Sequence, residues 1–243
     1  MSLYNWRMQE SSIVSSCQHH HVARKEHERS GTLLLLITVL FGLVLPASLL
    51  AGKTFVKPVA KTAINYPAHD FHRDENVAVA VDPYDNTEKT KIFTINFADH
   101  GFLPIFFVVT NDGDQPISIS RMQVKLITEN RSKLTPIDTD AMYRRLSNPQ
   151  AKTGTNNPLP FPKKVKGGVS KQEMDEIESS QFAAKAVEPH STQSGFFFFD
   201  VGDIKSPLRG ATIDVDGLAD SKGSELLFFE ILTDKYLDAP KNP

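Results

Sequence analysis

Apolar and polar residues alternate in several short stretches after residue 75, which predicts β-strands. Alternate positions are valine in residues 76–81, and Phe, Ile and Phe in residues 92–97, so each stretch presents one apolar face. Residues 102–109 are almost continuously apolar, as expected of a strand buried on both faces at the centre of a sheet. Further strands are predicted over residues 117–126, 195–201, 212–215 and 225–232. About seven or eight short strands separated by turns are typical of an antiparallel sandwich.

Two details of the pattern describe how these strands pack. Four consecutive phenylalanines, Phe196 to Phe199, place two side chains on each face of one strand, so both faces must be covered and the fold must have two layers. In residues 117–126 the apolar side chains change parity near Ser120 or Arg121. A β-bulge, or a strand that moves from one sheet to another, would produce this change.

Two helices are predicted between the strands. The first has Asp138 or Thr139 as its N-cap, and the second begins at Ser170, which forms an S-x-x-E capping box with Glu173. Both are interpreted as peripheral packing helices. The Pro- and Lys-rich stretch between them, residues 147–168, is predicted to be an extended loop. It is either a solvated linker or a docking peptide for an aromatic groove or an anionic membrane surface.

An uncharged apolar segment, residues 31–52, precedes the predicted strands and is about long enough to cross a bilayer. Basic residues precede it, as on the cytoplasmic side of a signal peptide or anchor. We therefore expect residues 31–52 to be a signal-peptide h-region or a transmembrane anchor. Residues 1–30 are expected to be a disordered polar leader, residues 53–75 an extended lead-in, and residues 76–243 a domain outside the cytoplasm, either periplasmic, secreted or membrane-anchored.

Charge and cysteine content narrow the function classes. The formal net charge is −2, which argues against a nucleic-acid partner. The chain has one cysteine, Cys17, so an exported domain would form without disulfides and without thiol catalysis or thiolate metal sites. Cys17 is followed by three histidines, residues 19–21, which form either a metal-binding tract or part of the disordered leader.

Two stretches carry a resemblance to a known class of domains. The first is Val108-Val109-Thr110-Asn111 followed by residues 115–119, and the second is Val187-Glu188-Pro189-His190 leading into residues 195–200. They resemble Ig-like β-sandwich domains of bacterial exported proteins, many of which have no assigned function. The first stretch is similar to a strand, Asn turn and strand unit in which an asparagine joins two core strands. These domains often have glycine after the proline, where this chain has His190.

The resemblance implies an overall fold and no catalytic residues. The fold class expected is mainly β, an Ig-like antiparallel β-sandwich with one or two short peripheral helices, preceded by an N-terminal signal or anchor helix.

The first candidate for site chemistry is a metal site at His69, Asp70 and His72. Two imidazoles and a carboxylate within four residues have the ligand types that copper or zinc would take. On an extended chain His69 and His72 point to opposite sides, whereas on a helical turn they share a face. The alternative is an exposed polar loop, which we favour, so no metal or cofactor is expected.

The remaining candidates are weaker. His190 and Ser191 resemble half of a hydrolase pair, but the sequence has no G-x-S-x-G elbow. His100 is expected to have a structural role in a turn. Two groups of aspartates lack the spacing of a known calcium loop and are interpreted as solvated turn residues: Asp82 with Asp85, and Asp214 with Asp216 and Asp220.

Together these observations predict a non-enzymatic binding, scaffolding or envelope-assembly module outside the cytoplasm. Its partner would be another envelope or extracellular protein, with a membrane contact through residues 31–52 if that segment is retained. One alternative is a periplasmic metal-handling protein that uses His69 and His72. A second alternative is a hydrolase with residues dispersed over loops.

Overall fold

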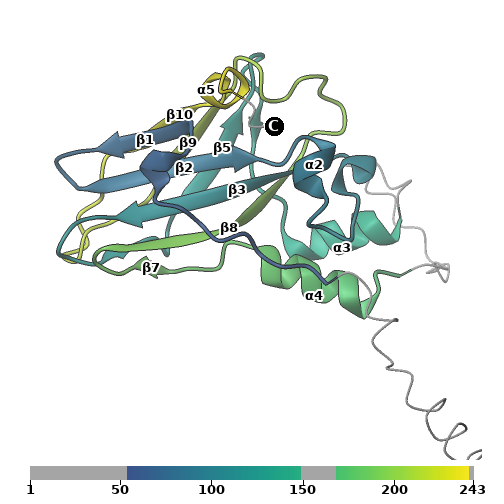
Figure 1. The fold of residues 1–243 in the computed structure, drawn as a ribbon, viewed down its shortest axis with the longest axis horizontal. Helices are drawn as coiled ribbons and strands as arrows, with labels where there is room; N and C mark the ends of the chain where they lie inside the picture. The colour runs from purple at the N-terminus through teal and green to yellow at the C-terminus, as the bar shows by residue number, and fades with distance from the viewer. Residues whose placement is uncertain (1–53, 149–167, 241–243) are drawn as a thin grey trace, which may run out of the picture. The chain divides into compact units, whose positions relative to one another are not determined.

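The computed structural model describes residues 54–148 and 168–240 (Figure 1). The predictions for residues 1–30 and 31–52, for Cys17, and for most of the loop at 147–168 lie outside these residues. Within the described ranges, none of the helices is both long and apolar enough to span a membrane. The described domain is mainly β, with antiparallel sheets and a few short helices.

The first sheet has four antiparallel strands in the order β1-β2-β3-β8. Its central strand β3 is buried along its whole length, which confirms the prediction from its unbroken apolar run. The strands are β1 (Ala68–His72), β2 (Val77–Pro83), β3 (Phe102–Asn111) and β8 (Ser191–Asp200).

The second sheet also has four antiparallel strands, in the order β10-β9-β5-β6. A separate pair is formed by β4 and β7. The strands of the second sheet are β5 (Gln123–Ile127), β6 (Lys133–Leu134), β9 (Thr212–Asp216) and β10 (Phe229–Leu232), and the separate pair is β4 (Ile117–Ser118) with β7 (Ala186–Val187).

Two apolar clusters follow from the alternation of side chains along the first sheet. The inner cluster joins one face of that sheet to the second sheet and includes Val79, Phe107 and Phe199 together with Ile213 and Ile231. The outer cluster lies on the opposite face of the first sheet. It includes the alternate residues of the same strands, among them Ala80, Phe106, Phe196 and Phe198. The four phenylalanines of β8 are therefore divided between two packed faces, as predicted.

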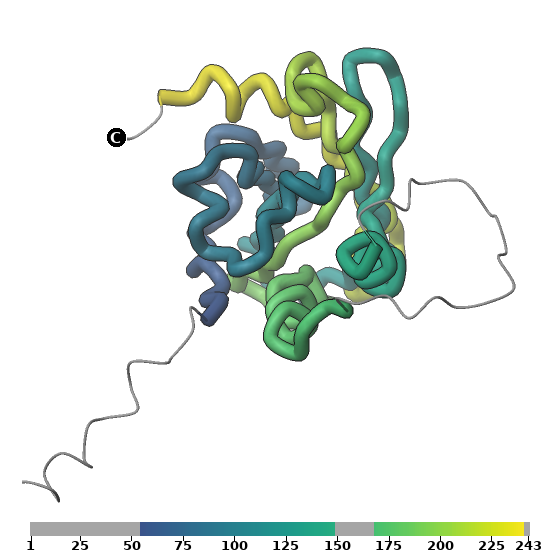
Figure 2. The backbone as a smooth tube through the Cα atoms, turned by 90° about the vertical axis from the view of Figure 1, so that its right-hand side faces the viewer, coloured from purple at the N-terminus to yellow at the C-terminus, as the bar shows by residue number. Residues whose placement is uncertain are grey.

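Helices and an irregular segment cover the outer cluster. Met142 of α3 (Thr139–Ser147) and Ile177 of α4 (Lys171–Ser180) both pack into it. Figure 2 shows these helices as neighbouring coils at one end of the domain. Both predicted caps are present, since Asp138 accepts a hydrogen bond from Ala141 N at 2.7 Å and Ser170 forms the capping box. The shorter helices α2 (Thr87–Thr90) and α5 (Asp234–Leu237) were not predicted.

The parity change in residues 117–126 is a change of sheet. β4 pairs with β7, whereas β5 pairs with β9 and β6 in the second sheet. A turn at Ser120 and Arg121 separates β4 from β5, and Met122 N donates to Ile119 O at 3.2 Å across it. The apolar side chains before and after the turn both enter the inner cluster, which requires the observed change of parity.

Asn111 joins the two stretches that carry the Ig-like resemblance. Its side chain is buried, and its amide donates to Gln115 O at 2.8 Å and to Val187 O at 3.2 Å. Its Oδ1 accepts from Gly113 N at 3.0 Å. His190, at the position where glycine is common, has φ +52°, so the left-handed turn forms without glycine.

Three predictions about elements are wrong: a strand at residues 92–97, an extended segment at residues 53–75, and the start of the last strand. Residues 92–97 form an irregular segment followed by the 3-10 helix η3 (Phe97–His100). Residues 53–75 are not only an extended lead-in, because they contain the short 3-10 helix η2 (Ala63–Asn65) and strand β1, which pairs with β2. The strand predicted over residues 225–232 begins only at Phe229.

Candidate functional site

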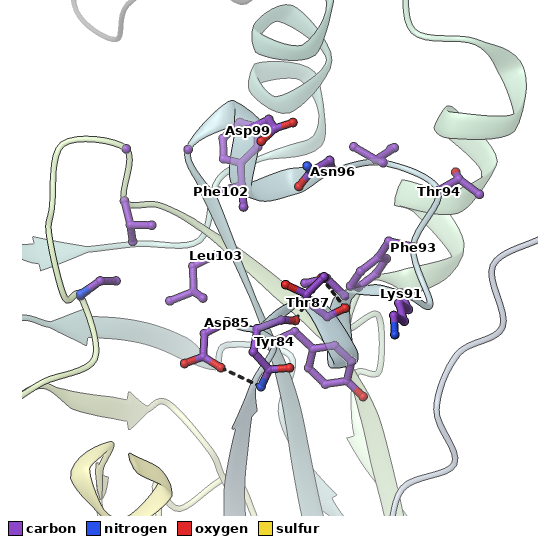
Figure 3. Close-up of a pocket in the computed structure, with 18 residues that line it drawn as sticks. Tyr84, Asp85, Thr87, Lys91, Phe93, Thr94, Asn96, Asp99, Phe102 and Leu103 are labelled. Carbon is purple, nitrogen blue, oxygen red and sulfur yellow. Dashed lines mark hydrogen bonds between the residues drawn. The ribbon is translucent and has the colours of Figure 1, made fainter. Parts of the chain in front are cut away.

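A cleft of about 640 Å³ opens at one end of the first sheet, where β2 ends, β3 begins and β8 ends. Its walls are α2, the segment 92–101 and the turn that follows β8 (Figure 3). Loops placed on a rigid scaffold of strands are common positions for binding residues, since they tolerate polar side chains that the core does not. This cleft is therefore the candidate functional site.

The floor of the cleft is apolar and tightly packed. It is formed by buried side chains, including Tyr84, Phe93, Phe102 and Leu103. The Phe93 ring meets the Phe97 ring edge-on, with centroids 5.0 Å apart, and the Tyr84 ring meets Phe196 in the same way at 4.9 Å. Edge-to-face packing of this kind fixes ring orientations, so the floor is preformed.

The rim of the cleft is polar. Figure 3 shows Asn96 and Asp99 on one wall and Asp85 and Thr87 on the opposite wall, with Phe102 and Leu103 between them. These four polar residues are exposed. A ligand in the cleft would meet carboxylate, amide and hydroxyl groups at its edges and apolar surface below, which is the usual composition of a binding pocket.

Glu176 of α4 holds the wall that carries Asn96. Its carboxylate is only 3% exposed and accepts hydrogen bonds from Thr94 N at 2.9 Å and Ile95 N at 3.2 Å, and also from the Thr94 hydroxyl. These N–H groups would pair with a neighbouring strand if residues 92–97 formed one. Because a helix supplies the acceptor instead, the alternating apolar side chains remain buried while the backbone is irregular.

Ion pairs and hydrogen bonds fix the opposite wall. Lys89 pairs with Asp82 and donates to Tyr236 Oη at 3.2 Å, and the Tyr236 hydroxyl donates to Asp85 at 2.6 Å. Burial raises the pKa of Tyr236, and its hydrogen bond to Asp85 adds to the increase. Burial likewise raises the pKa of Tyr84, with a smaller effect of the Asp82 charge. Asp82 and Asp85 thus accept contacts from protein groups that fix this wall.

Arg145 anchors the end of the cleft to α3. Its guanidinium makes two hydrogen bonds to the Asp200 carboxylate, at 2.6 and 3.2 Å. Beside this pair Gly101 has φ +77°, and a side chain there would come within 2.9 Å of Gly202 Cα. Glycine is required at position 101 by both its conformation and its close contact with the turn after β8.

The predicted metal ligands lie on β1, outside the lining of the cleft. His69 and His72 fall on opposite faces of the strand, as expected for an extended chain, and His69 Nδ1 lies 2.6 Å from Tyr66 O. The ring nitrogens of His72 lie 3.3 Å from Asp70 and 2.9 Å from Glu75. Within residues 54–148 and 168–240, no cluster of three or more His, Cys, Asp or Glu side chains could hold a metal ion.

These carboxylates instead close the edge of the second sheet. Asp70 accepts a hydrogen bond from Glu230 N, and Glu75 accepts one from Leu227 N, both at 3.0 Å. The His72 ring stacks on Phe229 with centroids 4.0 Å apart. The cluster therefore satisfies backbone groups that an edge strand leaves unpaired. Residues 68–72 have no apolar alternation that would have predicted β1, and the contact of Glu75 with Leu227 depends on the second sheet.

The proposed hydrolase pair is not assembled. Ser191 Oγ donates to Glu188 O at 2.7 Å, while His190 Nε2 lies 3.1 Å from Asp114. His100 ends η3, and its Nδ1 is buried without a hydrogen-bond partner among the described residues. The structural role expected for His100 stays a prediction.

The second group of aspartates is also dispersed. Asp216 pairs with Lys125 at 2.8 Å, and Asp220 accepts hydrogen bonds from the backbone of its own turn. Asp214 points outward from β9, beside Asp216 on the same face.

Comparisons with known proteins leave the family open. No protein-family model matches the chain, and no curated protein matches it. Among solved structures, it is similar to a conserved hypothetical protein from Bacillus anthracis, with 14% sequence identity and a TM-score of 0.26. The similarity covers 67% of this chain and 91% of that one. A TM-score this low carries no argument about fold or function.

Proposed function

We propose that the chain is a non-enzymatic binding module with an Ig-like β-sandwich, acting outside the cytoplasm, whose cleft receives part of another envelope or extracellular protein. The observation that carries this proposal is the cleft itself. It combines a preformed aromatic floor with an exposed rim of carboxylate, amide and hydroxyl groups at the loop end of a sandwich.

The groups around the cleft favour recognition over chemistry. Lys91 is held by Glu88 at 2.7 and 2.8 Å, and Lys89 is held by Asp82. These lysines are thus engaged by carboxylates of the same wall. Exposed groups such as Asn96 and Asp99 remain available to a ligand.

Two features support the Ig-like assignment. The sheets share the inner cluster, and Asn111 joins β3 to the ends of β4 and β7 as the resemblance implies. The compartment is supported by the uncharged apolar segment 31–52 and the basic residues that precede it.

The test uses the full chain in its native host, with a photo-crosslinking amino acid at Asn96 of the cleft rim. A matched variant carries it at Asn65, an exposed asparagine in η2, which packs at the end of β3 away from the cleft. We expect a protein adduct from position 96 that is absent from position 65. Adducts of equal yield from both positions, or from neither, would contradict the cleft as the binding site.

A reporter fused after Pro243 tests the compartment separately. It should be active only outside the cytoplasm. Activity of a cytoplasmic reporter at the same position would overturn the location while leaving the cleft result to stand.

A further inference from the structure

The outer faces of the two sheets differ in how they are covered. Helices and the segment 92–100 bury the outer cluster on the first sheet. On the second sheet the outward side chains of β5, β9 and β10 are all exposed or half-buried. An antiparallel sheet can face water on one side, so exposure of this face needs no partner by itself. The composition of this face, however, indicates a partner.

The strand register sorts these outward residues into rows. One row runs from Leu232 to Thr212 and then Ile127, and is largely apolar. Leu232 is 46% exposed, and Phe228, which precedes β10, is 62% exposed. Leu232 and Phe228 lie at the two ends of the edge strand with Glu230 between them, so exposed apolar and acidic side chains are interleaved along β10.

The adjacent row places two carboxylates side by side. Glu230 of β10 lies directly opposite Asp214 of β9, and Asp214 lies opposite Lys125 of β5. Lys125 makes its ion pair with Asp216, at 2.8 Å, so the three carboxylates Glu230, Asp214 and Asp216 share one lysine and the group carries a net negative charge. Among the described residues neither Glu230 nor Asp214 has a salt-bridge partner. Like charges directly opposite each other destabilise a pair of strands.

We propose that this face docks a basic, amphipathic segment of a partner protein. Lysine or arginine side chains of the segment would neutralise Glu230 and Asp214, and its apolar side chains would cover Leu232 and Phe228. Both features that are unfavourable in the isolated domain, the repelling carboxylates and the exposed apolar groups, are relieved together by such a partner. This surface is separate from the cleft and goes beyond the function proposed for it.

The structure argues against other modes of contact. The partner does not extend the sheet at β10, because the outward N–H groups of Leu227 and Glu230 already donate to Glu75 and Asp70. A symmetric second copy would bring like carboxylates together, and an anionic membrane would be repelled by them.

The experiment measures binding of the full chain to a synthetic amphipathic helix of leucine and lysine, and to the same peptide with glutamate in place of lysine. The test variant is Asp214→Asn with Glu230→Gln, and a second variant is Leu232→Ser. The matched control is Asp203→Asn with Glu188→Gln, two exposed carboxylates away from this face. The cleft variant Asn96→Trp is included to separate the two sites.

We expect the lysine peptide to bind and the glutamate peptide not to bind. The paired carboxylate variant should weaken binding roughly fivefold to thirtyfold, and Leu232→Ser should weaken it as well. The control and Asn96→Trp should leave it unchanged. Because the carboxylate variant removes repulsion, its thermal unfolding midpoint should equal or exceed that of the parent, which excludes misfolding as the cause.

Three results would overturn the proposal. Equal binding of both peptides, or equal weakening by the control variant, would show that the face is not selective. Dimerisation of the chain that is lost on Leu232→Ser would assign the face to a second copy. Binding to vesicles of anionic lipid that the carboxylate variant strengthens would assign it to a membrane.

Discussion

Glu176 holds the cleft wall, so replacing it should lower the free energy of unfolding more than replacing an exposed residue of the same helix. In Glu176→Ala the backbone N–H groups of Thr94 and Ile95 lose their acceptor. The N–H of Ile95 is buried, whereas that of Thr94 is partly accessible to water. Leaving a buried donor unsatisfied costs about 1–3 kcal/mol, and a hydrogen bond to a charged group contributes about 1.5–3 kcal/mol. We therefore expect Glu176→Ala to lower the free energy of unfolding by about 3–5 kcal/mol.

Glu176→Gln tests whether the acceptor oxygens themselves matter. The side chain keeps its size and one oxygen, but its NH₂ group faces the N–H donors that the second oxygen accepts. We expect a loss of about 2–3 kcal/mol, smaller than that of the alanine variant. The matched control is Glu178→Ala on the same helix, because Glu178 is exposed and accepts a single hydrogen bond, from the Tyr143 hydroxyl at 3.1 Å. That change should stay within about 1 kcal/mol of the parent.

The assay is urea denaturation of residues 53–243, followed by circular dichroism. The transition of the parent should be cooperative, insensitive to reductant and β-dominated in its spectrum, since this region has no cysteine and few helical residues. If Glu176→Ala unfolds at the same urea concentration as Glu178→Ala, water can replace the carboxylate. The wall of the cleft would then not depend on α4.

Three further predictions concern other parts of the domain. Phe198 is buried, so Phe198→Ala should lower the free energy of unfolding by about 3–5 kcal/mol. Phe197 is half-buried, so Phe197→Ala should lower it by about 1.5–3 kcal/mol. Equal values for the two variants in urea denaturation would contradict the division of β8 between two unequal faces. Asp70→Ala should cost about 1–2 kcal/mol and accelerate amide exchange of Glu230, while the exposed control Asp74→Ala does neither. The four tyrosines of residues 53–243 have pKa values raised above 10.0, mainly by burial, so the neutral phenols stabilise the fold fully below pH 10 and this contribution falls as the pH rises beyond it. At pH 10 the folded domain should show less tyrosinate absorbance than the urea-unfolded domain, and equal absorbance would refute these shifts.

Local sequence patterns were sufficient to predict the strands and helices whose geometry depends only on residues close together in the sequence. The alternation in residues 76–81 and the apolar run in residues 102–109 predicted β2 and β3, because period-two burial follows from strand geometry alone. The caps at Asp138 and Ser170 located α3 and α4, since capping involves residues only three apart. The parity change near Ser120 or Arg121 predicted either a β-bulge or a change of sheet, and the strand pairing shows the change of sheet.

Only the tertiary structure decided what long-range partners supply. Residues 92–97 alternate like a strand, and the alternate apolar side chains are buried. The backbone N–H of Ile95, however, donates a hydrogen bond to the carboxylate of Glu176, 81 residues away, and not to a neighbouring strand. His69, Asp70 and His72 have the composition of a metal site. In the structure, however, Asp70 and the nearby Glu75 accept hydrogen bonds from backbone N–H groups at the edge of β10. Hydrophobic periodicity reports which side chains are buried. It carries no information about which distant group accepts the backbone hydrogen bonds. Those acceptors are Glu176 at the cleft wall, and Asp70 and Glu75 beside β10.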